Sequence, residues 1–177
     1  MHPRVLSLIA LNVLGGMAVL GSYVSGLGES GVGDALWGGV PESLRPLYTV
    51  NMFAAAAGYF LFASYILFRL PPDATRIAGR FDYRLFHLLF ALVLLPSALW
   101  LPLTEEMVRA PSGLLWVLIR IDLALVGIGA LGLLAALLSL SDAVPRGRTL
   151  AVIGLLPFCL QTAVLDALVW PVFYPVP

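Results

Sequence analysis

The sequence contains no lysine, one cysteine and two histidines. Without a lysine amine no retinal Schiff base can form, so a rhodopsin-type function is excluded. Cys159 alone can form neither an intrachain disulfide nor a cysteine-based metal cage. His2 lies at the terminus, which leaves only His87 in an apolar stretch, so a haem held between two membrane histidines is also excluded. We expect no metal site.

Charge is scarce as well. Only 11% of the residues are charged, 60% are hydrophobic, and the mean hydropathy is +0.98. The formal net charge is zero and the arginines are dispersed, which argues against a nucleic-acid partner. A soluble domain of 177 residues could not bury so much apolar surface. No phosphate-binding glycine loop or Ser-His-Asp set is visible, so an enzyme is not the favoured class.

Five apolar stretches account for this composition. Each is near the roughly 20 residues that a helix needs to cross a bilayer. They predict an all-α polytopic membrane protein, a single five-helix bundle over residues 1–177. The stretches are Val5–Leu27, Pro46–Leu70, Leu85–Leu103, Leu114–Leu140 and Leu150–Pro171.

The arginines divide unevenly between the two sides of such a bundle. The tendency of positive residues to stay inside places the N-terminus in the cytoplasm and the C-terminus outside, in a plasma membrane of the bacterial inner-membrane type. The outer side then holds Arg45 and Arg109. The cytoplasmic side holds Arg4, Arg69, Arg76, Arg80, Arg84, Arg146 and Arg148.

Polar residues inside the spans are costly in hydrocarbon and tend to face a partner or a cavity. Counted by helical rise, most of them fall in the outer half, whereas Asn12 lies deeper. Above them is a glycine-rich connection, residues 28–45, which we expect to act as a lid and which contributes Trp37. This pattern predicts a polar and aromatic outer cavity. The residues at outer depth are Tyr48, Asn51, Ser97, Trp100, Arg120, Asp122 and Asp166, with Gln161 also inside the fifth span.

Two kinds of contact between spans are predicted. Arg120 and Asp166 come to similar depth on neighbouring spans, so we expect an interhelical ion pair. Small residues one turn apart, Ala54 with Gly58 and Gly132 with Ala136, allow helix backbones to approach closely. We expect these to pack within the chain, although they leave a homodimer open. Trp170 is assigned to the outer aromatic belt.

Three segments resemble the tryptophan-rich sensory protein family, TspO, also called the translocator protein family. Pro46-Leu47-Tyr48-Thr49-Val50, followed by Gly58-Tyr59-Phe60-Leu61, is similar to its Pro-x-Trp-Thr…Ala-Ala-Tyr-Leu run. Ser97-Ala98-Leu99-Trp100-Leu101-Pro102-Leu103 resembles its Asn-x-x-Trp-Ser-Pro-Leu, and Leu155-Leu156-Pro157-Phe158 its Leu-Val-Pro-Tyr. Because Tyr48, Ser97 and Gln161 replace the usual tryptophan, asparagine and tryptophan, the chain resembles a distant relative.

The resemblance implies a receptor-like bundle with no required cofactor. It would bind a flat hydrophobic small molecule, such as a porphyrin (a tetrapyrrole), a sterol, an isoprenoid or another lipid, beneath the first outer loop. The residues expected to bind it are Trp37, Tyr48, Asn51, Ser97, Trp100, Asp122, Gln161 and Asp166.

Two other function classes stay open. A membrane enzyme or transporter would use Arg120, Asp122 and Asp166 on an ionic or lipid-like substrate. A structural subunit of a larger complex would form a solid bundle without a cavity, and its polar residues would face a partner chain.

Overall fold

The computed structural model describes residues 1–26, 36–141 and 145–174. Within them, five helices are long and apolar enough to cross a membrane, and the chain is an all-α membrane bundle. The single-helix spans are α1 (Pro3–Gly26), α3 (Arg45–Phe68), α4 (Arg84–Arg109) and α5 (Gly113–Leu138). The fifth span joins α6 (Arg148–Cys159), the π-helix η1 (Leu160–Val169) and α7 (Trp170–Phe173).

Local sequence explains where several helices begin. Pro46 lies in the first turn of α3, where a residue without a backbone N–H costs no hydrogen bond. The hydroxyl of Ser112 caps α5 by accepting a hydrogen bond from the backbone of Leu115, at 3.2 Å. The third span is longer than predicted, because its helix continues past Leu103 to Arg109. There Thr104 and Met107 are buried against the bundle, so the helix gains packing beyond the apolar run.

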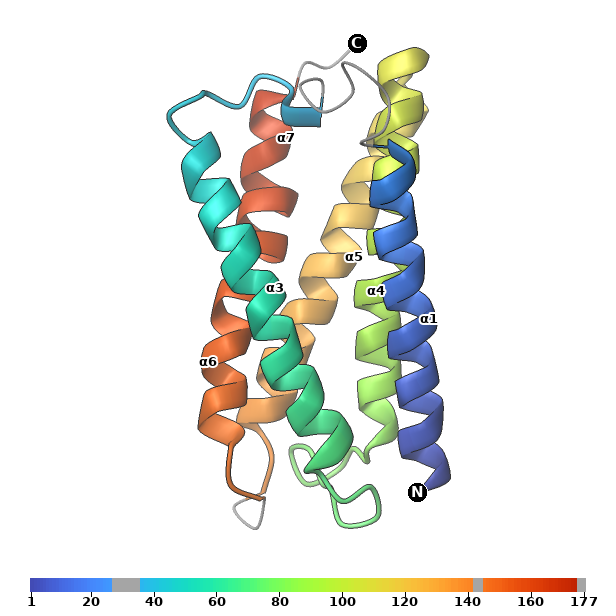
Figure 1. Ribbon diagram of the computed structural model, residues 1–177, viewed down its shortest axis with the longest axis vertical. Coiled ribbons are helices and arrows are strands. Elements are labelled where there is room, and N and C mark those ends of the chain that lie inside the picture. Colours follow the sequence, from blue (N-terminus) through green and yellow to red (C-terminus); the bar gives the residue numbers. More distant parts are fainter. Residues whose placement is uncertain (27–35, 142–144, 175–177) are drawn as a thin grey trace.

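The helices form a ring in the order α3, fifth span, α5, α4 and α1 (Figure 1). Extensive packing joins each neighbouring pair except α1 and α3, which barely touch. The chain enters α1 at one end of the bundle and leaves α7 at the other (Figure 1). We call the half that contains the start of α1 the lower half, and the half that contains α7 the upper half.

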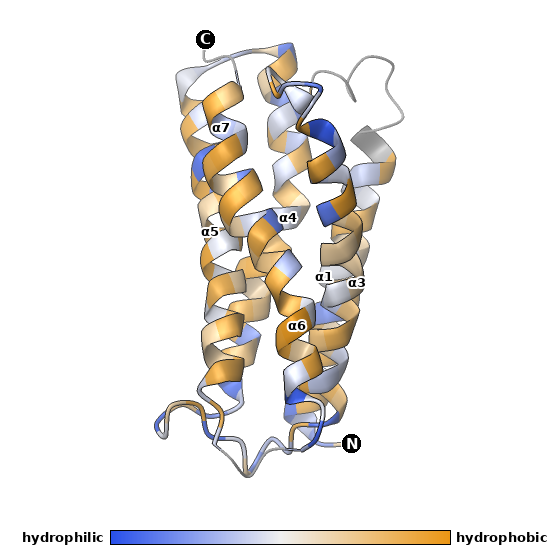
Figure 2. Cartoon of the chain, turned by 90° about the vertical axis from the view of Figure 1, so that its left-hand side faces the viewer, coloured by the Kyte–Doolittle hydropathy of each residue, from blue (hydrophilic) through white to orange (hydrophobic). Residues whose placement is uncertain are grey.

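Hydrophobic residues predominate along the visible helices, with hydrophilic ones interspersed (Figure 2). Side chains such as Leu14, Phe53, Phe60 and Ile128 are exposed, which in water would be a severe cost. Because lipid solvates these side chains, the exposed apolar surface indicates that the protein is integral to a bilayer.

The lower half contains a closely packed core. Phe62, Phe86 and Phe90 are fully buried, and the rings of Phe62 and Phe90 stack with centroids 6.2 Å apart. Gly58 of α3 faces Gly154 of α6 so closely that a Cβ on Gly58 would overlap the carbonyl oxygen of Gly154. Small residues therefore set the distance between α3 and α6.

The predicted small-residue contacts are formed in part. Gly58 makes a backbone contact within the chain, and Gly132 packs against Leu89 of α4. Ala54, however, is exposed, because the contact surface of α3 runs through Ala55 and Gly58 instead.

Candidate functional site

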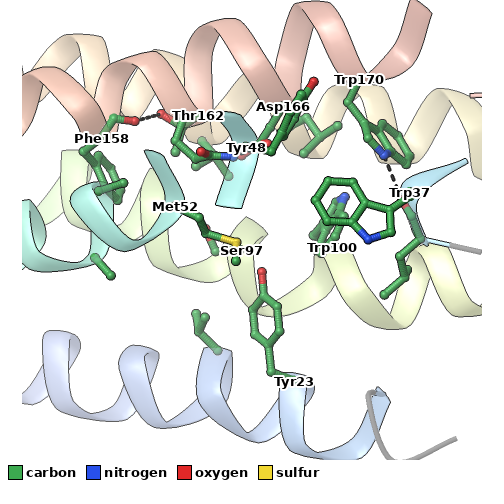
Figure 3. A pocket seen from close by; sticks show the side chains of 17 residues that line it. Tyr23, Trp37, Tyr48, Met52, Ser97, Trp100, Phe158, Thr162, Asp166 and Trp170 are labelled. Atoms are coloured by element: carbon green, nitrogen blue, oxygen red, sulfur yellow. Dashed lines mark hydrogen bonds between the residues drawn. The ribbon is translucent and has the colours of Figure 1, made fainter. Parts of the chain in front are cut away.

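A cavity of about 430 Å³ lies in the upper half of the bundle (Figure 3). Its described walls come from α1, α3, α4, α5, the fifth span and the short segment before α3, and most of their surface is apolar. Ligand pockets in proteins range from about 300 to 1,000 Å³, so the cavity can hold a small hydrophobic molecule. The described lining residues are Val19, Tyr23, Leu36, Trp37, Tyr48, Met52, Ala55, Ala56, Ser97, Trp100, Leu123, Val126, Phe158, Gln161, Thr162, Asp166 and Trp170.

Aromatic rings from different helices form much of the wall. Tyr23 of α1 lies 6.3 Å from Trp100 of α4, measured between ring centroids. Trp37 meets Tyr48 edge to face at 5.9 Å, and the guanidinium of Arg45 lies 5.5 Å from the Trp37 ring. Rings held against one another in this way offer faces and edges for stacking on a flat or unsaturated ligand.

The floor of the cavity separates it from the core of the lower half. Phe158, which lines the cavity, packs against Phe62 at 5.3 Å and Tyr59 at 5.9 Å between ring centroids. The Tyr59 hydroxyl donates a 2.6 Å hydrogen bond to Oδ1 of Asn12, which joins α3 to α1 at this depth. The deep polar residue of the first span thus closes the bundle below the cavity.

Above that hydrogen bond the cavity reaches the lipid-facing side between α1 and α3. Met52 and Ala56 line the cavity from α3, yet both are exposed on the surface of the span. Val19 and Tyr23 line it from α1, the helix that barely touches α3. Figure 3 shows Tyr23 and Met52 pointing into the space from α1 and α3. A molecule dissolved in the bilayer could therefore enter sideways.

A series of hydrogen-bonded polar side chains runs along the wall formed by the fifth span. Nδ2 of Asn51 donates to Oε1 of Gln161 at 3.0 Å and to the carbonyl of Pro157 at 3.1 Å. Nε2 of Gln161 in turn donates to Oδ1 of Asp166 at 2.8 Å. Buried polar groups in lipid need such partners, and this series leads from the buried Asn51 to a carboxyl at the cavity.

The π-helix explains why Gln161 and Asp166 meet. In an α-helix residues four apart stack on one face, whereas in a π-helix the hydrogen bonds join residues five apart. Gln161 and Asp166 are separated by five positions and lie inside η1, so its wider turn brings both side chains to the cavity. The hydroxyl of Tyr48 also donates to the carbonyl of Leu165, at 2.9 Å, within the same segment.

The structure gathers most of the predicted site residues. Trp37, Tyr48, Ser97, Trp100, Gln161 and Asp166 all line the cavity. Asn51 is buried behind the wall and reaches it only through Gln161. Asp122 is buried in α5 outside the described lining, and its Oδ2 has no hydrogen-bond partner in the described part of the chain. Residues 28–35 of the predicted lid lie outside the described residues.

The predicted ion pair between Arg120 and Asp166 is not formed. Arg120 is exposed on α5, while Asp166 faces the cavity and accepts from Gln161. The ion pairs between described residues are His2 with Asp73, at 3.3 Å, and Arg4 with Asp82, at 3.6 Å. Depth alone predicted the pair. Depth does not say which way a side chain points around its helix, and on α5 the inward face carries Ile119 and Leu123.

Trp170 is also placed differently from the prediction. Instead of lying in an outer belt it is buried, lines the cavity and donates from Nε1 to the carbonyl of Leu36, at 2.9 Å. Its ring lies 6.3 Å from Trp100 and 4.5 Å from Tyr174. The fifth span therefore continues to the end of the bundle as part of the wall.

Sequence reasoning missed Tyr23, Met52, Phe158 and Thr162 as lining residues. Tyr23 carried a usable signal, because an aromatic residue with a hydroxyl sits at upper depth in the first span. Phe158 belongs to a segment that resembles the family motif but was not assigned to the site, and Met52 carried no signal, because single apolar residues in apolar helices look alike in sequence.

Comparison of the chain with protein-family models, with curated proteins and with solved structures found no match.

Proposed function

We propose that this integral membrane protein binds a hydrophobic small molecule in the upper cavity, in the manner expected of a TspO-like receptor. The observation that carries the proposal is the cavity itself, an aromatic space of about 430 Å³ with a lateral approach from the lipid. The candidate ligands are a porphyrin, a sterol and an isoprenoid.

Two features favour binding over the other function classes. A structural subunit predicts a solid bundle, whereas this bundle contains a cavity in its upper half. An enzyme or ion transporter built on Arg120, Asp122 and Asp166 predicts that these groups converge. They do not, because Arg120 is exposed, Asp122 is buried outside the described lining and Asp166 faces the cavity.

The orientation of the bundle belongs to the proposal. At the lower end Arg69, Arg76, Arg80, Arg84 and Arg146 are all exposed, which favours the cytoplasmic side of a bacterial inner membrane. The cavity then opens in the outer leaflet. Reporter fusions at Met1 and Pro177 test this, and both reporters on the same side would contradict five spans.

The ligand can be identified without choosing candidate molecules in advance. The protein is purified from its native membrane in nanodiscs, and the co-purified small molecules are identified by mass spectrometry and compared with those of empty nanodiscs. We expect enrichment of one hydrophobic class at about one molecule per protein. Ala55→Phe, which fills the cavity from a buried lining position, is the control and should lose the enrichment.

A further inference from the structure

Free hydrogen-bonding groups are few on the cavity wall. Thr162 donates to the carbonyl of Phe158, and Tyr48 to that of Leu165. Both ends of the Gln161 amide are used by Asn51 and Asp166.

Asp166 and Trp100 are exceptions. Oδ1 of Asp166 accepts from Gln161, while its Oδ2 accepts nothing from the described residues. Nε1 of Trp100 is a buried donor without a partner in the described part of the chain. The amide of Gln161 holds the Asp166 carboxyl on the cavity wall, so its second oxygen can accept a hydrogen bond from a ligand. The hydroxyls of Tyr23 and Ser97 also line the cavity, and neither makes a hydrogen bond within the described chain.

The same wall has no positive charge among its described residues. The described lining residues include neither arginine nor histidine, and the sequence contains no lysine. The guanidinium of Arg45 lies over the ring of Trp37, and Arg45 is not one of the described lining residues. A ligand carboxylate placed inside would face Asp166 without a compensating cation, in a medium where an unpaired charge is very costly.

The geometry points to a ligand class narrower than that of the proposed function on which this inference rests: a hydrophobic alcohol whose hydroxyl donates to Asp166. The apolar body of the molecule fills the space between Met52, Val126 and Phe158. Gln161 and Asn51 act as positioning residues that hold the carboxyl in place. Sterols and isoprenoid alcohols belong to this class, whereas a porphyrin with free propionates does not.

The test compares three probes with nearly the same apolar body: farnesol, its methyl ether and the corresponding carboxylic acid. Protein in nanodiscs is equilibrated with pairs of probes, and native mass spectrometry measures the ratio of bound species. That ratio is divided by the ratio in empty nanodiscs, which removes differences in partitioning. We expect the alcohol to bind at least about tenfold more tightly than the ether, because the ether leaves the free oxygen of Asp166 without a hydrogen-bond donor.

Two variants assign the preference to Asp166. Asp166→Leu removes the acceptor and should reduce the alcohol-to-ether ratio to about one. It should also improve binding of the acid. Asp166→Asn should also lose the preference, because its single amide oxygen accepts from Gln161 and its NH2 group, a donor, takes the place of the free oxygen. The ether is the internal control for folding, since its binding to Asp166→Leu shows that the cavity is intact. Should Asp166→Leu fail to fold, Asp166→Asn carries the test.

The outcomes separate the inference from the proposed function. Equal binding of alcohol and ether to the wild type, or an unchanged preference in Asp166→Leu, would overturn the role of Asp166 while leaving a binding cavity. Preferred binding of the acid to the wild type would do the same. If no probe binds the wild type, while the native extract also shows no enriched molecule, the proposed function itself fails.

Discussion

The two halves of the bundle use the same helices and similar residue types, yet they are built differently. In the lower half the aromatic side chains pack on one another, as Phe62 and Phe90 do, and glycine brings α3 against α6. Aromatic side chains also pack together in the upper half, as Trp170 and Tyr174 do, but there they leave a cavity, and α3 and α1 separate. Closed packing in one half holds the helices at fixed positions, so the other half can stay open without collapsing.

Helix geometry also differs between the halves. The fifth span is α-helical where it faces Gly58 and π-helical beside the cavity. π-helical turns are uncommon and are often found at functional sites. Here the wider turn carries Gln161 and Asp166 to the wall. The comparison predicts that truncations in the lower core mainly reduce stability and that loss of a ring facing the cavity mainly reduces binding.

The largest effect is expected for Phe62→Ala. Phe62 is fully buried in the lower core, and such a truncation costs about 3–5 kcal/mol of unfolding free energy. The reversible thermal unfolding of the protein in nanodiscs measures this cost. Ligand affinity should be nearly unchanged at temperatures where the variant remains folded. A variant with wild-type stability would show that the lower half is not the core.

A smaller loss is expected for Gly58→Ala. The added Cβ would overlap the backbone of Gly154, so α3 and α6 must move apart, at about 1–3 kcal/mol. Gly16→Ala is the matched control in α1, because a Cβ there meets nothing within 4 Å. It should be neutral or slightly stabilising. Equal thermal shifts in both variants would contradict the close approach.

In the upper half, Trp100→Ala should act on binding. Trp100 lines the cavity between Tyr23 and Trp170, so its loss should weaken binding of the ligand by about tenfold, equivalent to 1.4 kcal/mol. Native mass spectrometry of the wild type and the variant, each with a probe that binds the wild type, measures this loss of affinity. Trp116, which is buried but does not line the cavity, supplies the control as Trp116→Phe. A wild-type affinity in Trp100→Ala would move the site elsewhere.

Tyr48→Phe tests the support of the π-helix. The ring remains on the cavity wall, but the carbonyl of Leu165 loses its 2.9 Å hydrogen bond. We expect a loss of about 1 kcal/mol in unfolding free energy. Hydrogen exchange of the amides in residues 160–169 should increase relative to Tyr59→Phe, a control that removes a tyrosine hydroxyl below the cavity. Unchanged exchange would mean that the bond does not hold the segment.

The smallest effect is expected for coupling between Arg120 and Asp166. Since the two side chains are not paired, the stability changes of Arg120→Gln and Asp166→Asn should add to within about 0.5 kcal/mol in the double variant. Thermal unfolding of the four proteins forms the cycle. Recovery of stability in the double variant would instead reveal a pair.

The sequence was sufficient for the number of spans and for the depth of the site. Runs of apolar residues have the length of the bilayer, and polar residues such as Tyr48, Ser97 and Asp166 were placed in the upper half by counting rise. It was not sufficient for the direction of side chains around a helix. Arg120 is exposed for this reason, and Trp170 turned out to be a wall residue.

The π-helix could not be predicted. Residues 160–169 contain neither glycine nor proline, and the flanking Pro157 and Pro171 predict an irregular helix without indicating a π-helix. Because the pairing of Gln161 with Asp166 depends on the change of helix type, the series of polar side chains behind the cavity is visible only in three dimensions. The opening between α1 and α3 likewise follows from packing, since α1 packs extensively against α4 and barely touches α3.

The most direct measurement is native mass spectrometry of wild type and Ala55→Phe released from nanodiscs that contain a sterol, an isoprenoid alcohol and a porphyrin dimethyl ester. Ala55 is a buried wall residue, so a phenyl ring there occupies the cavity. The account predicts a one-to-one adduct of wild type with at least one probe and at least about a tenfold smaller adduct for Ala55→Phe. Absence of any such adduct from wild type, or equal adducts in the two proteins, would contradict a ligand-binding upper half.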